Sequence, residues 1–142
     1  MPDTLIVAAA VVDSLAAATR VVSARRTEPP RWAGWWEFPG GKVEPGESPV
    51  AALHRELAEE IGVTVRLGAE LPGPALIDGA RPWPIDEGLL MRVWFVEVVT
   101  GVPRVIDDHD ELRWLSVDEL DSVPWLPGNV GVLQAARAFM RP

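Results

Sequence analysis

The chain has no cysteine among its 142 residues, so disulfides, zinc–thiolate sites and thiol nucleophiles are excluded. Basic residues are also scarce, because 13 Lys and Arg stand against 21 Asp and Glu and leave a net charge of −8. A chain this acidic is not expected to follow the phosphates of a nucleic-acid polymer. It would also repel a nucleoside triphosphate unless cations mediated the contact, so its charge favours a metal-dependent site.

Long apolar runs are missing as well, since no stretch reaches the roughly 18–20 residues that a membrane span requires. The first residues, MPDTLIVAAAVVDSLAAA, carry Asp3 and Asp13 and have no basic leading segment. We therefore interpret them as a strand and not as a signal peptide. We expect a cytoplasmic protein without a membrane partner, folded as one domain over residues 1–142.

Apolar patterns and turn residues predict strands and helices along the whole chain. Strands are expected at residues 5–12, 17–23, 35–38, 64–71, 89–99 and 111–116. Helices are expected at residues 49–61 and 128–140, with a helical turn at 117–120. Ser48 as N-cap and Gly62 as C-terminal stop bound the first helix. Residues 71–87 contain four prolines and two glycines, which predicts a loop.

The rest of the chain is organised around residues 41–63, GKVEPGESPVAALHRELAEEIGV. Gly41 is followed after five residues by Glu47, and seven further residues lead to Arg55. The predicted helix then carries three glutamates, Glu56, Glu59 and Glu60, within an arc of about 100°. The neighbouring arc is apolar and would pack on a sheet; it contains Val50, Leu53, Leu57 and Ile61.

Carboxylates crowded on one helix face repel one another unless something neutralises them. Hard divalent cations prefer oxygen ligands, so Glu56, Glu59 and Glu60 are candidate metal ligands for Mg²⁺, with Mn²⁺ as the alternative. Arg55 is expected to orient a glutamate through charge-assisted hydrogen bonds, and Glu47 to close the site from the loop. Such a site suits attack of water on a diphosphate linkage. The alternative is a solvated acidic face, which the like charges of Glu56 and Glu60 at i,i+4 spacing oppose.

The complete spacing resembles the Nudix box, G-x5-E-x7-R-E-U-x-E-E-x-G-U, in which U is aliphatic. This resemblance implies the α+β Nudix fold, an α/β/α sandwich with a mixed sheet between helices. It also implies Mg²⁺-dependent hydrolysis of a nucleoside diphosphate linked to another moiety. Gly41 is a further candidate for the metal site. The sequence does not assign the general base, and Glu59 is our hypothesis for it. Relatives have one further carboxylate near the metals. Asp108 matches it by distance from Trp114, and Glu111 is the alternative.

Segments outside the box narrow the resemblance. TRVVSARR and GWWEFPGGKVEPGE resemble the MutT and CTP-pyrophosphohydrolase branch, which hydrolyses nucleoside triphosphates, including 8-oxo-dGTP, to monophosphate and pyrophosphate. This resemblance places Arg26 at the substrate phosphates and Phe38 at the base. Glu37, Gly40 and Lys42 are further candidate substrate-binding residues. The alternatives are a solvated loop arginine at Arg26 and a core phenylalanine at Phe38.

Two later segments bear on the substrate. WLPGNVGVL resembles the stretch whose asparagine reads the purine edge, which places Asn129 at the base; the alternative is that Asn129 caps the last helix. ARPWPIDEG partly resembles NADH pyrophosphatases, although Ala80-Arg81 replaces Ser-Gln and no zinc-binding cysteine exists. His109 is interpreted as a surface loop residue, with a pH-sensitive base as the alternative.

The leading hypothesis is a MutT-like 8-oxo-dGTP diphosphatase that removes damaged nucleotides from the pool. The alternatives are a CTP, dCTP or 5-methyl-dCTP pyrophosphohydrolase, an ADP-ribose or NADH pyrophosphatase, and a nucleotide-sensing module without turnover. A nucleoside triphosphate is the expected partner, and the chain is expected to be a monomer or homodimer.

Overall fold

The computed structural model describes residues 4–142, so Met1, Pro2 and Asp3 of the expected domain lie outside the described part. The strands are β1 (Thr4–Val12), β2 (Arg20–Arg26), β3 (Trp36–Glu37), β4 (Gly40–Lys42), β5 (Thr64–Leu71), β6 (Trp83–Asp86), β7 (Leu89–Thr100) and β8 (His109–Ser116). The helices are α1 (Pro49–Ile61), the 3₁₀ turns η1 (Val117–Ser122) and η2 (Pro127–Asn129), and α2 (Val130–Phe139). No helix within residues 4–142 is both long and apolar enough to cross a membrane.

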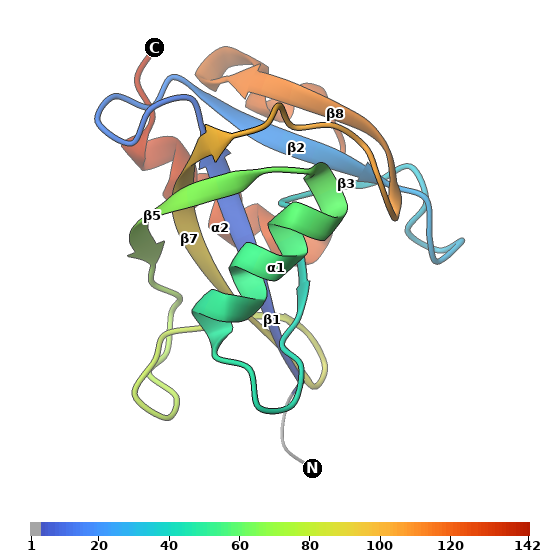
Figure 1. The fold of residues 1–142 in the computed structure, drawn as a ribbon, viewed down its shortest axis with the longest axis vertical. Helices are drawn as coiled ribbons and strands as arrows, with labels where there is room; N and C mark the ends of the chain where they lie inside the picture. The colour runs from blue at the N-terminus through green and yellow to red at the C-terminus, as the bar shows by residue number, and fades with distance from the viewer. Residues whose placement is uncertain (1–3) are drawn as a thin grey trace.

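The strands form one mixed sheet. Its main path has the order β3-β2-β1-β7-β5, while β4 pairs with β1, β6 with β7 and β8 with β2. β1 and β7 run parallel from the Thr4–Leu89 pair to the Val12–Glu97 pair, and β1 runs antiparallel to β2 and β4. Helix α1 covers one face of the sheet and α2 the other (Figure 1). This arrangement confirms the α+β fold with a mixed sheet between helices.

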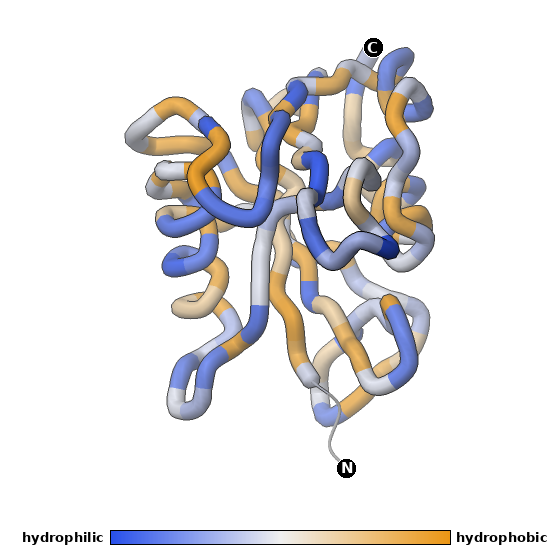
Figure 2. Tube along the Cα trace, turned by 90° about the vertical axis from the view of Figure 1, so that its right-hand side faces the viewer, coloured by the Kyte–Doolittle hydropathy of each residue, from blue (hydrophilic) through white to orange (hydrophobic). Residues whose placement is uncertain are grey.

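The central strand β1 is buried on both faces, which explains its continuous apolar sequence. Figure 2 shows this hydrophobic segment rising through the middle of the molecule from the N-terminus. Val7, Ala9 and Val11 pack in one core with Leu53, Leu57 and Ile61 of α1. Ala8, Ala10 and Val12 face the other core, which contains Val132, Leu133 and Ala136 of α2.

Helix α1 begins and ends as predicted. The side chain of Ser48 accepts a hydrogen bond from the Ala51 backbone N–H at 3.1 Å, and Pro49 is the first helical residue. Gly62 has φ 72° and its N–H donates to the carbonyl of Ala58, which ends the helix. These local signals therefore determine where the carboxylate-bearing helix begins and ends.

Some predicted elements differ from those in the structure. β2 begins at Arg20, because the preceding residues form a turn closed by Asp13, whose carboxylate accepts hydrogen bonds from the backbone N–H groups of Thr19 and Arg20. Strand β6 lies inside the predicted loop, where Pro84 obscured it; pairing with β7 holds it at the sheet edge. The last helix begins at Val130 and not at Gly128, because residues 127–129 form the 3₁₀ turn η2; Val130 itself is 43% exposed.

Candidate active site

A cavity of about 760 Å³ lies beside α1 and contains most of the residues singled out by the sequence. It is lined by β1, the end of β2 and the loop after it, β3, β4, α1, β6, the start of β7, the residue before β8 and the segment around η2. Eight of the candidates line it: Arg26, Glu37, Phe38, Gly40, Gly41, Lys42, Asp108 and Asn129. Of the glutamates of α1, Glu56 and Glu60 line the cavity.

Arg55 donates hydrogen bonds to three carboxylates, those of Glu47, Glu56 and Glu59. Its Nε and Nη2 donate to the two carboxylate oxygens of Glu47 at 2.7 and 3.0 Å. Its Nη1 donates to Glu56 at 2.9 Å and to Glu59 at 3.2 Å, and Nη2 also reaches the carbonyl of Lys42 at 3.1 Å. The hydrogen bonds from Arg55 lower the pKa of Glu47 to about 2. Arg55 therefore fixes the orientation of carboxylates, as its place in the sequence predicted.

Glu56 is buried and its carboxylate lies against Gly41. A Cβ atom at position 41 would stand 2.3–2.6 Å from the carboxyl atoms of Glu56, so only glycine leaves room for them. At Gly40 a Cβ would come within 1.9 Å of the carbonyl oxygen of Val7, because β4 pairs closely with β1. Burial raises the pKa of Glu56, and the guanidinium of Arg55 only partly offsets this.

His109 corrects the sequence interpretation, because it is not a surface loop residue. It is the first residue of β8, pairs with Arg26 next to a register shift, and its side chain is 1% exposed. Its Nε2 lies 2.9 Å from Oε2 of Glu37, and its Nδ1 lies 3.1 Å from Oε2 of Glu60. Burial alone would lower the pKa of His109, but the contacts with Glu37 and Glu60 outweigh it and raise that pKa to about 9.

His109 therefore lies between Glu37 of β3 and Glu60 of α1, and its raised pKa favours the protonated form. The contact with Glu37 is a hydrogen bond, whereas Nδ1 and Glu60 Oε2 approach each other without hydrogen-bond alignment. Those two buried atoms have no other partner within the part of the chain that the structure describes. Glu60 thus lines the cavity while its Oε2 is buried beside His109 without a hydrogen bond.

Of the remaining candidate carboxylates, Asp108 lines the cavity, whereas Glu59 and Glu111 do not. Glu59 has a 57% exposed side chain, lies outside the cavity lining and contacts Arg55. Asp108 lines the cavity from a left-handed backbone conformation with φ 61°, whereas Glu111 lies outside the lining and pairs with Arg113 and Arg25. Between the two alternatives, the structure therefore places Asp108 at the cavity.

Several residues have the oxygen atoms that Mg²⁺ prefers, although no three acidic or histidine side chains within residues 4–142 are already close enough to enclose an ion. Glu56, Glu60 and Gly41 all line the cavity, and their carboxylates and backbone carbonyl form an all-oxygen donor set in which Oε2 of Glu60 has no hydrogen bond. Arg55 and His109 neutralise these carboxylates in the structure. The donor set therefore fits a divalent cation that would replace some of these contacts.

Arg26 is not a solvated loop arginine. Its Nη1 donates to both carboxylate oxygens of Glu37 at 3.0 and 2.9 Å, and its Nε donates to the carbonyl of Glu28 at 2.8 Å. Glu37 therefore stands between two cationic groups, Arg26 and His109. Most of the donor capacity of Arg26 is used within the protein.

Phe38 and Asn129 form another part of the cavity wall. Phe38 is 2% exposed and its ring lies 4.8 Å from that of Trp125, so it belongs to the core and to the cavity at once. Oδ1 of Asn129 accepts a hydrogen bond from the backbone N–H of Phe38 at 3.1 Å. The side chain of Asn129 does not cap α2, which removes that alternative. Its Nδ2 group remains as a donor.

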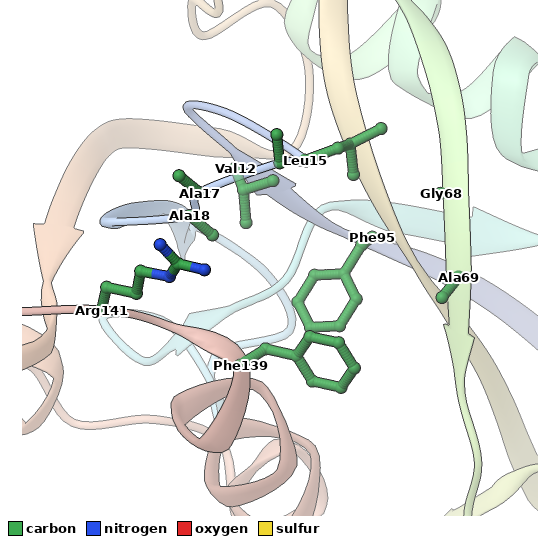
Figure 3. Close-up of a pocket in the computed structure, with 10 residues that line it drawn as sticks. Val12, Leu15, Ala17, Ala18, Gly68, Ala69, Phe95, Phe139 and Arg141 are labelled. Carbon is green, nitrogen blue, oxygen red and sulfur yellow. The ribbon is translucent and has the colours of Figure 1, made fainter.

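A second cavity, of about 290 Å³, lies between the turn after β1 and the end of α2 (Figure 3). Leu15, Phe95 and Phe139 line it, and Arg141 supplies its charged group. Its lining includes no carboxylate, so it offers no counterpart to the acidic wall of the larger cavity.

Comparisons with known proteins agree with this geometry. A family model described as NUDIX domain matches residues 4–135. The "Putative 8-oxo-dGTP diphosphatase 2" of Mycobacterium tuberculosis is 37% identical over 134 residues, covering 92% of this chain and 86% of that protein. The CTP pyrophosphohydrolase of Escherichia coli is 32% identical, covering 84% of each chain.

The crystal structure of the MutT NUDIX hydrolase from Burkholderia pseudomallei is similar in fold, with a TM-score of 0.74 and 29% identity. The similarity covers 95% of this chain and 98% of that one. The family match spans the cavity, the box, all of α1 and the first part of α2. The chain therefore belongs to the Nudix hydrolase family, in the branch similar to MutT and CTP pyrophosphohydrolase.

Proposed function

We propose that this protein is a Mg²⁺-dependent pyrophosphohydrolase that converts a nucleoside triphosphate, foremost 8-oxo-dGTP, to the monophosphate and pyrophosphate. One observation carries the proposal: a single cavity joins the carboxylates of Glu56 and Glu60 to the apolar and amide surface of Phe38 and Asn129. Its volume of about 760 Å³ lies within the usual range for small-molecule sites. Phosphates and base can therefore be bound at the same time.

We assign the metal site to Glu56, Glu60, the backbone of Gly41 and Asp108. Bound Mg²⁺ would polarise the phosphate oxygens and lower the pKa of the attacking water. Arg55 orients Glu56 through Nη1, and His109 holds Glu60 at the cavity. Both contacts fix the carboxylates before substrate arrives, which reduces the reorganisation needed for catalysis.

Glu59 is our candidate general base. It is the most exposed of the three glutamates, and the ion pair that joins it to Arg55 at 3.2 Å is also exposed. Exposed ion pairs contribute little free energy, so a rotation of Glu59 away from Arg55 costs little. That rotation would free the carboxylate to accept a proton from water.

Asn129 supports the purine proposal. Since its Oδ1 is bound to the backbone of Phe38, its Nδ2 group is oriented by the protein and presents a donor. A donor in this position recognises a carbonyl oxygen such as that of a guanine base. The similarity to the E. coli CTP pyrophosphohydrolase favours a second candidate, a cytidine triphosphate, whose base also carries a carbonyl oxygen.

A substrate screen tests the proposal. Chromatographic separation of nucleotides would follow turnover of 8-oxo-dGTP, dGTP, CTP, dCTP, 5-methyl-dCTP, ADP-ribose and NADH, each with Mg²⁺ and with EDTA. We expect the highest kcat/KM for 8-oxo-dGTP and monophosphate as its product. A higher kcat/KM for CTP or 5-methyl-dCTP would select the second candidate. Absence of Mg²⁺-dependent turnover of every compound would overturn the assignment as an enzyme.

A further inference from the structure

Carboxylates outnumber cationic side chains in the cavity wall. Its six carboxylates are Glu37, Glu44, Glu56, Glu60, Asp86 and Asp108, whereas its cationic side chains are Arg26, Arg31 and Lys42. Each positive group therefore has a large effect on whether a polyanion binds.

Neither Arg31 nor Lys42 has a carboxylate partner within the described residues 4–142, and of these two cations only Arg31 carries a guanidinium. Arg26 uses Nη1 and Nε on Glu37 and the carbonyl of Glu28. The guanidinium of Arg31 instead lies 4.7 Å from the ring centroid of Trp32, which also lines the cavity. All five N–H donors of Arg31 are thus available to a ligand, while the indole restricts where the guanidinium lies.

The loop between β2 and β3 holds this pair beside the acidic end of the cavity. The backbone N–H of Thr27 donates to the carbonyl of Asp108 at 3.2 Å, and that of Gly34 donates to the carbonyl of Arg26 at 2.9 Å. The loop is also closed internally, because the N–H groups of Trp32 and Ala33 both donate to the carbonyl of Pro29. The ring of Trp32 rests edge-on against Trp35, with centroids 5.6 Å apart.

We propose that Arg31, supported by the ring of Trp32, binds the phosphate chain of the substrate and raises the preference for a triphosphate over a diphosphate. This inference rests on the proposed function, since it concerns the same cavity. A guanidinium binds phosphate oxygens through two parallel hydrogen bonds, which a lysine cannot reproduce. Because Arg26 is paired with Glu37, it has fewer N–H donors left for phosphate, and Arg31 supplies the remaining contact.

Steady-state kinetics of Arg31→Ala, Arg31→Lys and Trp32→Leu would test the proposal, with the preferred triphosphate and the matching diphosphate as substrates. The matched control is Arg20→Ala, because Arg20 also stacks on a tryptophan, Trp114, at 5.3 Å but lies outside the cavity lining. All variants would first be compared with the wild type by circular dichroism and thermal melting.

We expect Arg31→Ala to raise the KM of the triphosphate about 10-fold, with a smaller rise for the diphosphate and kcat within about 2-fold of the wild type. Arg31→Lys and Trp32→Leu should give intermediate values, and Arg20→Ala should match the wild type. A triphosphate KM in Arg31→Ala equal to that in Arg20→Ala overturns the inference and leaves the proposed function standing.

If the wild type turns over no triphosphate, the proposed function fails and a binding measurement decides the inference separately. Calorimetric titration with inorganic tripolyphosphate and Mg²⁺ should then show binding to the wild type and to Arg20→Ala, weakened about 10-fold in Arg31→Ala. Equal affinities in the three proteins, or no binding to the wild type, would overturn the role of Arg31.

Discussion

The substitution Gly41→Ala places a single methyl group against the carboxylate of Glu56. Gly41 does not have a positive φ, so alanine can adopt its backbone conformation and the effect is purely steric. The added Cβ would lie 2.3 Å from the carboxyl carbon of Glu56 and 2.4 and 2.6 Å from its oxygens. Ordinary van der Waals contact begins at 3.4 Å, so the carboxylate has to move by about 1 Å.

That displacement breaks the alignment of Glu56 with Nη1 of Arg55, now 2.9 Å from Oε1, and moves a proposed metal ligand. A 1 Å misplacement of a catalytic group costs about 100-fold in rate. We therefore expect kcat to fall about 100-fold in Gly41→Ala. The fold should survive, because the atoms that must give way are the end of a side chain and not the backbone.

Gly40→Ala is the matched control, since its Cβ would meet the carbonyl of Val7 at 1.9 Å and thus the backbone of β1. Thermal melting should show a large loss of stability for Gly40→Ala and a small one for Gly41→Ala. Turnover of the preferred substrate, measured over a series of Mg²⁺ concentrations, should show the reduced kcat of Gly41→Ala. A kcat of Gly41→Ala within about 2-fold of the wild type would refute the role given to Glu56.

Three further predictions concern buried contacts. His109→Leu should lower the free energy of unfolding in EDTA by about 3 kcal/mol, because it leaves the buried Glu60 without its cationic partner, whereas Glu37 keeps Arg26. The pKa of His109 is raised from 6.5 to about 9, so its contribution to the free energy of unfolding should be complete below pH 6.5 and should disappear as the pH rises through 9. Urea titrations of the wild type that give the same free energy of unfolding over this pH range would contradict this. Arg55→Lys should lower kcat about 10-fold at unchanged circular dichroism, because lysine cannot bind three glutamates at once; normal kcat would remove its orienting role. Asn129→Ala should lower the free energy of unfolding by about 1–3 kcal/mol, because it leaves the backbone N–H of Phe38 unpaired. It should also raise the KM for the purine nucleotide, and a loss of stability without a change in KM would argue against base recognition.

Local sequence signals accounted for much of the fold. The bounds of α1 follow from Ser48, Pro49 and Gly62, whose effects act within one helical turn. The burial of β1 on both faces followed from its unbroken apolar run. Strand β6 could not be predicted in this way, because Pro84 is an unfavourable strand residue and only the pairing with β7 compensates for it.

The candidate site likewise combines features that local sequence signals predicted with features that they did not. Spacing along the chain placed Glu56, Glu59 and Glu60 on one helix face, but it did not show that Glu56 and Glu60 line the cavity whereas Glu59 is exposed and paired with Arg55. The chain also offered no sign that the loop residue Arg31 lines the same cavity, since a lone arginine in a loop is usually solvated.

What the sequence determined by itself is the chemistry of one helix face, because helical periodicity and caps depend on residues a few positions apart. The tertiary structure alone decided what meets that face. His109 reaches Glu37 across 72 positions of sequence, and Asn129 reaches the backbone of Phe38 across 91. Those contacts arise from the pairing of β8 with β2 and the packing of η2 near β3, which no periodicity within a single element encodes.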